Sequence, residues 1–438
     1  MEWQNALLLM LAIVCGLMAL GLPVALAFFA ANIAGAVIFL GYPAGLVSVV
    51  RGSMASITNF TLAPIPLFLM MGEVLMQTGL AFKAVAAIDR LITRVPGRLA
   101  VVAVAGGTVF SALSGSTIAT TAMLGNSLLP QMIQRRYHPT MAMGPIMAIG
   151  GVDMLIPPSA LAVLLGSLAR IPVAELLIGG IVPGLIMSAL FVAYIVLRCW
   201  LEPSLAPGGE TLQRYTLRER WMPFAQHVLP LFAIFLVVVG GIFTGLASPT
   251  DSAALGAVLT VAITLAYRAL TWKILVNSLR EVAKVTTMIF FIIAASLTFS
   301  QILAFSGATD GALAQIMQHK FTPLTAVLWM VAILLVLGCF VDQASMMLLT
   351  LPFFMPIAQA LSIDLVYLGV VFLISMQIGL LTPPFGLLLF VMKGVAPPGI
   401  RMTQIYAAAG PFVVLTMAVL AMVIVYAPLA TWLPGVFL

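Results

Sequence analysis

Two double prolines interrupt apolar stretches of the chain, at positions where an ion could bind. Pro157–Pro158 lies in the string Leu-Ile-Pro-Pro-Ser, and Pro383–Pro384 lies in Leu-Thr-Pro-Pro-Phe. A double proline removes two N–H donors and forces the residue before it out of the helical region, so a helix must open there. The opened turn exposes carbonyl oxygens to a cation, and the next half-helix offers free N–H groups to an anion. We therefore expect each double proline to mark a broken helix that binds ions.

Two polar strings inside apolar segments form a second pair of candidate sites. One string, 111–117, divides the segment 99–134, and the other, 338–343, divides the segment 322–361. The arms of the first segment are shorter than the roughly 20 residues that a full crossing needs. Basic residues also flank that segment at both ends. The pattern predicts two re-entrant helical hairpins, whose tips must be buried in protein or line a cavity.

The elements that must position these strings are membrane spans. The other apolar runs are long enough to cross a bilayer, and two of them, 141–169 and 366–392, contain the double prolines. One clearly hydrophilic linker, 202–222, divides the chain into repeats at 1–201 and 223–438. Amphipathic stretches precede the first hairpin and the span 285–306. The remaining spans are expected at 5–22, 24–48, 61–79, 176–199, 226–246, 250–267 and 406–432.

Composition supports this all-α polytopic membrane fold. Of 438 residues, 63% are hydrophobic and 7% are charged, whereas a soluble domain is about 25% charged. The composition excludes a cytosolic enzyme, a secreted domain and a disordered scaffold. The net charge of +6 comes from scattered basic residues, which argues against nucleic-acid binding. The three cysteines and three histidines are too far apart in sequence for a disulfide framework or a His-based metal centre.

The distribution of basic residues predicts the orientation. With both hairpins re-entrant, 16 of the 19 Lys and Arg residues lie on the side of the 202–222 linker, and three, Arg51, Arg170 and Lys320, lie on the other. The positive-inside rule makes the first side cytoplasmic and places both termini in the periplasm.

The two halves also match each other at a constant offset of 226 residues. The offset relates Pro157 to Pro383, and it also relates Pro130 to Pro356 and Gly184 to Gly410. The first hairpin opens toward the cytoplasm and the second toward the outside, so the repeats are inverted. Inverted repeats with broken helices are typical of secondary transporters.

The strings at the tips and breaks resemble a known family, the large membrane subunit of TRAP (tripartite ATP-independent periplasmic) transporters. They are Ser114-Gly-Ser-Thr-Ile-Ala-Thr, Gly150-Gly-Val-Asp-Met-Leu-Ile-Pro-Pro-Ser, Gly179-Gly-Ile-Val-Pro-Gly, Pro249-Thr-Asp-Ser-Ala-Ala, Gly338-x-x-x-Asp and Gly379-Leu-Leu-Thr-Pro-Pro-Phe-Gly. Asp251 stands where the family usually has Glu, and the charge is kept. The resemblance implies a sodium-driven, elevator-type importer of organic acids in the bacterial inner membrane. It also implies two partners, a separate small four-helix membrane subunit and a periplasmic binding protein.

The resemblance further implies which residues bind ions and substrate. Sodium would be held by Ser114, Gly115, Ser116, Leu155 and Pro157 in the first repeat, and by Gly338, Phe340, Gly379 and Thr382 in the second. Substrate would be held by Ser116, Thr117, Pro157, Pro158, Ser159, Asp342, Pro383 and Pro384. We expect no organic cofactor, and we expect the protein to contact the lipid bilayer.

Some roles and rival functions stay open at this level. Asp342 either binds the ligand or orders its tip, Asp153 is a candidate cap for the broken helix, and Glu73 is an intramembrane carboxylate of undecided role. A stand-alone sodium/dicarboxylate symporter of the same architecture is the nearest rival. An intramembrane enzyme is disfavoured because no Ser–Lys, paired-Asp or His-x-x-x-His set appears at a suitable depth. A channel is disfavoured by the two inverted hairpins.

Overall fold

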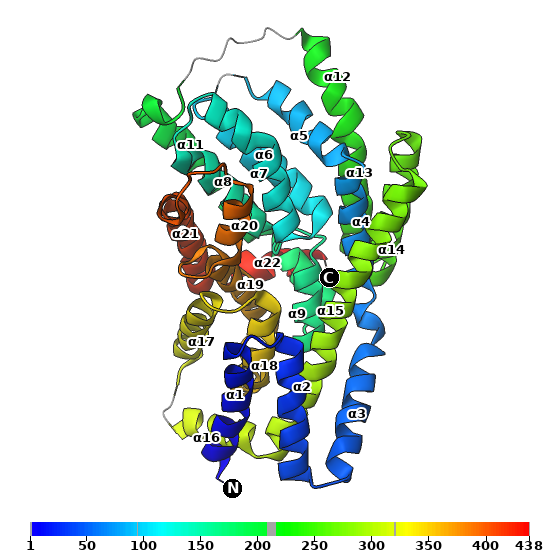
Figure 1. The fold of residues 1–438 in the computed structure, drawn as a ribbon, viewed down its shortest axis with the longest axis vertical. Helices are drawn as coiled ribbons and strands as arrows, with labels where there is room; N and C mark the ends of the chain where they lie inside the picture. The colour runs from blue at the N-terminus through cyan, green and yellow to red at the C-terminus, as the bar shows by residue number, and fades with distance from the viewer. Residues whose placement is uncertain (1, 94, 208–215, 319–320, 438) are drawn as a thin grey trace.

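The computed structural model describes residues 2–93, 95–207, 216–318 and 321–437 (Figure 1). Over these residues the chain is helical and contains no strand, so the predicted all-α class is confirmed. Six of the helices are long and apolar enough to cross a membrane, and eight shorter helices are also apolar. Polytopic membrane insertion follows from these helices.

The helices of the first repeat run in the following order. They are α1 (Trp3–Ala19), α2 (Val24–Gly35), the π-helical turn η1 (Ala36–Leu40), α3 (Ala44–Ile57), the 3-10 turn η2 (Phe60–Leu62), α4 (Pro64–Gln77), α5 (Leu80–Leu91), α6 (Arg98–Ser114), α7 (Thr117–Gln134), α8 (Pro139–Val152), α9 (Ala160–Ala169), α10 (Val173–Gly179) and α11 (Ile181–Leu201).

The second repeat follows a short 3-10 turn, η3 (Pro203–Leu205). Its helices are α12 (Leu217–His227), α13 (Leu229–Phe243), α14 (Pro249–Ala266), α15 (Trp272–Phe305), α16 (Ala308–Gln318), α17 (Pro323–Gly338), α18 (Gln343–Ala360), α19 (Leu365–Leu381), α20 (Leu387–Val395), α21 (Met402–Val425) and α22 (Pro428–Phe437).

The structure contains two pairs of packed neighbouring helices and two interrupted helices. The hairpins are α6–α7 and α17–α18, and the broken helices are α8–α9 and α19–α20. The offset of 226 residues separates the starts of α7 and α18 (117 and 343) and the starts of α8 and α19 (139 and 365). In Figure 1, α6 and α7 lie toward the end that carries α12, whereas α17 and α18 lie toward the end that carries the N-terminus.

The core is centred on α8 and α19, the first halves of the broken helices. Every residue from Met141 to Val152 and from Val366 to Leu381 is buried. A helix that is apolar on all sides is stable only when other elements surround it. Both hairpins pack against these two helices, α6 and α7 on α8, and α17 and α18 on α19. The candidate binding strings are therefore held by the most buried part of the molecule.

Several expected spans were wrong in their boundaries. The run 24–48 is not one span, because Gly41 has φ +75° and Pro43 lacks an N–H, so the chain turns between η1 and α3. The run 406–432 divides into α21 and α22. The expected span 176–199 lies within one apolar stretch long enough to cross a membrane, Val173–Leu201, which comprises α10 and α11. The linker 202–222 is helical from Leu217, where Thr216 and Glu219 form a capping box; its residues 208–215 lie outside the described part.

Before the second hairpin, the sequence predicts a helix boundary that the structure does not have. The amphipathic stretch and the span 285–306 form one continuous helix, α15, of 34 residues. Ser278, Val282 and Ile289 keep the buried face in phase through the charged part of the sequence. The charged side chains therefore lie on the opposite, exposed face and do not end the helix.

Candidate functional site

The tip of the first hairpin is seated on the break of the first broken helix. Gly115 adopts the left-handed conformation, with φ 58°, and closes α6. A Cβ added to Gly115 would lie 3.1 Å from the carbonyl oxygen of Pro158. Only glycine combines this conformation with such a close approach. The backbone of the tip therefore meets the backbone of the break.

Serine side chains cap both half-helices that begin at this meeting point. Ser116 is the N-cap of α7 and accepts a hydrogen bond from the Ala119 N–H, and Ser159 caps α9 and accepts from the Ala162 N–H at 3.2 Å. Ser159 thus caps the second half-helix of the break, and Asp153 is the C-cap residue of the first, α8. Thr117, the first residue of α7, is buried.

The remaining candidates of the first repeat are also in the break. Pro157, Pro158 and Leu155 are all buried there. The carbonyl oxygen of Leu155 lies against Gly180, where an added Cβ would be 2.4 Å away. Ser114 ends α6, and its side chain is outside the described part.

The tip of the second hairpin contacts the second break even more closely. A Cβ added to Gly338 would lie 2.6 Å from the Cα of Gly379. The N–H of Phe385, within the break, donates a hydrogen bond to the carbonyl oxygen of Cys339 at 3.2 Å. The rings of Phe340 and Phe385 lie 6.1 Å apart. Both candidate glycines are thus contact points between the hairpin and the broken helix.

Two polar side chains of the second repeat have defined partners. The Thr382 hydroxyl donates to the carbonyl oxygen of Ile378 at 2.7 Å, which leaves its own oxygen lone pairs available to a cation. Asp342 is the N-cap of α18 and accepts from the N–H groups of Ala344 and Ser345. Of the two roles left open for Asp342, the structure shows the ordering of the tip.

The two breaks differ in their exposure. All residues of the first break are buried, whereas Pro383, Pro384 and Phe385 of the second break are exposed. The helix that follows the second break, α20, also differs from α7, α9 and α18 because no side chain caps its N-terminus. An uncapped N-terminus presents free N–H groups and a partial positive charge to an anion.

A cavity of about 220 Å³ separates the first tip from neighbouring helices. Ser116 of α7, Glu73 of α4 and Glu281 of α15 line it. Glu73 accepts a hydrogen bond from the Gln77 amide at 2.6 Å, and Glu281 pairs with Lys284. Glu281 carries no signal in the sequence that marks a cavity, because a glutamate one turn from a lysine is also typical of a solvated face.

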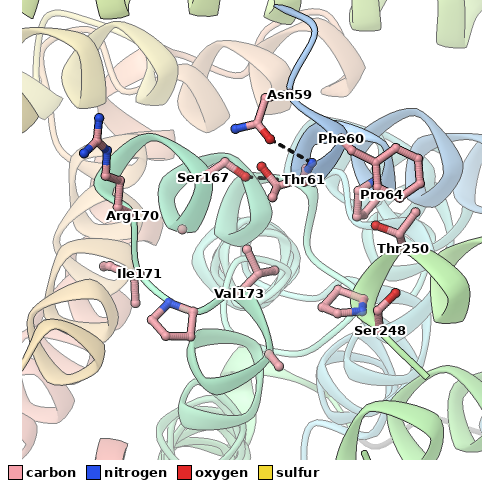
Figure 2. Close-up of a pocket in the computed structure, with 14 residues that line it drawn as sticks. Asn59, Phe60, Thr61, Pro64, Ser167, Arg170, Ile171, Val173, Ser248 and Thr250 are labelled. Carbon is pink, nitrogen blue, oxygen red and sulfur yellow. Dashed lines mark hydrogen bonds between the residues drawn. The ribbon is translucent and has the colours of Figure 1, made fainter. Parts of the chain in front are cut away.

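A larger cavity, of about 780 Å³, lies between the start of α4, the α9–α10 connection and the start of α14 (Figure 2). Arg170, at the C-terminal end of α9, is the only acidic or basic residue in its lining. Ser167 donates to the carbonyl oxygen of Thr61 at 3.4 Å across one wall. Arg170 was expected on the periplasmic side, but no pattern in the sequence indicated this cavity.

Comparison with known proteins identifies the family. The family model of the tripartite ATP-independent periplasmic transporter, DctM component, matches residues 11–429. The C4-dicarboxylate TRAP transporter large permease protein DctM of Pseudomonas aeruginosa is 31% identical over 87% of this chain and 86% of its own. The 2,3-diketo-L-gulonate TRAP transporter large permease protein YiaN of Escherichia coli is 30% identical over 89% and 90%. The sialic acid TRAP transporter large permease protein SiaM of Vibrio cholerae is 28% identical over 97% of both chains.

Solved structures share the fold at low identity. The YdaH transporter of Alcanivorax borkumensis superimposes with a TM-score of 0.63 at 13% identity, covering 88% of this chain and 90% of its own. Its match supports the transporter fold and says nothing about the cargo. The family model spans nearly the whole chain, and the DctM relative covers most of it. This chain therefore belongs to the TRAP transporter family as a large permease, a multi-pass membrane transport protein.

Proposed function

We propose that this large permease imports an organic acid in symport with sodium, by an elevator-type movement. The observation that carries the proposal is the contact of each hairpin tip with a helix break, at Gly115 and Pro158 in one repeat and at Gly338 and Gly379 in the other. Tips and breaks that meet in this way gather carbonyl oxygens and half-helix ends in one place. Secondary transporters bind ions and substrate at such places.

The substrate class follows from the relatives and from the helix ends. The relatives are named for C4-dicarboxylates, sialic acid and 2,3-diketo-L-gulonate, all of which carry a carboxylate. No lysine or arginine lies among the candidate residues of the tips and breaks. A carboxylate would therefore be held by helix N–H groups, and the uncapped start of α20, beside the exposed Pro383 and Pro384, supports this site.

Sodium suits the remaining oxygens. Hydroxyl and carbonyl oxygens are the ligands of hard cations, and Ser116 and Thr382 each place a hydroxyl at a tip or break. A sodium ion beside Thr382 would also lie at the C-terminal end of α19, where the helix dipole is negative. Bound sodium would in turn compensate the charge of the carboxylate.

The cavity beside Ser116 supports movement of the hairpin relative to α4 and α15. Those two helices pack against each other; α4 also packs against α14 and against α6 of the hairpin, and α15 also packs against α3. The boundary between Ser116 and Glu73 is loosely filled, unlike the close contact between Gly115 and Pro158. In our proposal, tips and broken helices move together against a scaffold that includes α4, α14 and α15.

The assembly and orientation are part of the same proposal. A separate small four-helix subunit and a periplasmic binding protein would complete the transporter in the bacterial inner membrane, with both termini periplasmic. The N-terminus and α12 lie at opposite ends of the molecule, which supports opposite sides for the N-terminus and the linker (Figure 1).

Reconstituted uptake tests this proposal. Proteoliposomes would carry this chain with or without the small subunit, and binding protein loaded with labelled succinate or sialic acid would be added outside. We expect uptake only with all three proteins and an inward sodium gradient. Robust uptake of micromolar free substrate by this chain alone would instead establish the stand-alone symporter.

A further inference from the structure

A buried polar cluster joins the first hairpin to the first broken helix behind the tip. The Thr120 hydroxyl of α7 donates a hydrogen bond to Asp153 Oδ2 at 2.7 Å. Asp153 follows the last residue of α8 and is 1% exposed, and Thr120 is fully buried. Thr120 lies one helical turn beyond Ser116, so the cluster is deeper in the protein than the serines that cap the tip.

A second hydroxyl of the cluster has no hydrogen-bond partner. Thr121 is 0% exposed, and its Oγ1 neither donates nor accepts a hydrogen bond among the described residues. This oxygen faces α8, because a Cβ added to Gly150 would lie 2.0 Å from it. Gly150 and Asp153 are three residues apart and share one face of the helix end. A buried polar atom without a partner costs about 1–3 kcal/mol, and a cation bound beside it would remove that cost.

The electrostatics of this position favour a cation. Asp153 is the only acidic or basic side chain that is buried in the described part of the chain. It stands at the C-terminal end of α8, where the negative end of the helix dipole adds to its charge. Buried charges in proteins are paired or coordinate metals, and half-helix C-terminal ends coordinate cations in transporters.

The second repeat shows that the fold does not require this cluster. At the offset of 226 residues, Met346 and Met347 replace the two threonines, and Gly379 replaces Asp153. Met346 and Gly379 lie together around Gly338, at 3.0 and 2.6 Å from a Cβ added there. One repeat thus packs this position without a carboxylate or a threonine hydroxyl, while the other repeat retains a buried carboxylate and, at Thr121, a hydroxyl without a partner.

We propose that Asp153, Thr120 and Thr121 bind one alkali-metal cation of sodium size, at a site separate from the tips. The carboxylate, the two hydroxyls and the backbone oxygens at the end of α8 would be its ligands. The ion would tie α7 to α8 and so hold the hairpin on its broken helix. The identity of the ion as sodium rests on the proposed sodium-coupled function, whereas the existence of a cation site does not.

Melting curves and sodium binding of the purified full-length chain in detergent test the site. Asp153→Asn keeps the shape and removes the charge. In choline chloride it should melt at a higher temperature than the parent, because a neutral amide costs less to bury than a carboxylate. It should also bind one fewer sodium-22 ion per chain in equilibrium dialysis. Thr121→Val should raise the sodium concentration for half-maximal stabilisation about tenfold, as expected for loss of one contact to a charge.

Thr416→Val is the matched control. Thr416 is also 0% exposed, but its hydroxyl donates to the carbonyl oxygen of Phe412 in its own helix. This variant should keep the parent's sodium dependence. Two results together would refute the site: Asp153→Asn binds as much sodium as the parent, and its melting temperature falls by the same amount in sodium chloride and in choline chloride. Asp153 would then have a structural role only. Because melting and binding need neither substrate nor partners, a failure of reconstituted uptake would leave this result unaffected.

Discussion

Gly338 and Gly379 meet backbone to backbone: a Cβ added to either residue would lie 2.6 Å from the Cα of the other. The contact joins the end of α17 to the last turn of α19, one turn before the second break. No side chain intervenes, so the tip and the break approach as closely as two helices can. The geometry makes this contact sensitive to a single methyl group.

Gly379→Ala should separate the second tip from its broken helix. Overpacking a close contact costs about 1–3 kcal/mol, so the melting temperature should fall and uptake by the reconstituted complex should be lost or strongly reduced. Gly410→Ala is the control, because an added Cβ there meets nothing within 4 Å and the residue lies inside α21. That substitution should leave uptake intact and stabilise slightly, by up to about 1 kcal/mol.

Thr382→Val and Ser116→Ala should each weaken sodium dependence without unfolding the protein. Each variant removes one candidate oxygen ligand, worth roughly 1.5–3 kcal/mol when it contacts a charge. The sodium concentration for half-maximal uptake should therefore rise about tenfold or more. Thr350→Val removes a buried hydroxyl that donates to the Met346 carbonyl oxygen at the same 2.7 Å, away from any break, and should behave as the parent. If the sodium dependence were unchanged in both test variants, the tips would be structural turns that bind no sodium.

A cysteine at Ser204 should report the side of the linker. Ser204 is exposed in the short 3-10 turn after α11. In a background without Cys15, Cys199 and Cys339, Ser204→Cys should resist an impermeant thiol reagent in intact cells and react after permeabilisation. Labelling in intact cells would overturn the cytoplasmic assignment and with it the orientation of both repeats.

Arg170→Gln should slow capture of an anionic substrate. Arg170 is exposed and is the only charged residue that lines the larger cavity, so it attracts anions that approach this face. We expect the substrate concentration for half-maximal uptake to rise a few-fold, with less difference at high salt and with the maximal rate unchanged. Arg51→Gln, an exposed residue outside that lining, should have little effect. Equal effects of both variants would show a general charge effect in place of a local one.

Much of the fold could be predicted from the sequence because its signals are local. Apolar composition requires a bilayer, and proline and glycine act on the backbone wherever they occur. The ends of the hairpins and broken helices therefore agree with the residues that break helices, such as Gly115 and Pro158. Helix continuity was less predictable, as α15 shows, since a charged face does not end a helix whose other face is packed.

Only the tertiary structure decides which of these local features meet. Thr120 and Asp153 are 33 residues apart in sequence, and their hydrogen bond depends on the packing of α7 against α8. The same holds for exposure: both double prolines look alike as strings, yet Pro157 is buried and Pro383 is exposed. Sequence patterns determine where a helix opens, because that is a property of neighbouring residues. Which oxygens, charges and cavities surround the opening is determined by non-local packing, which no single string encodes.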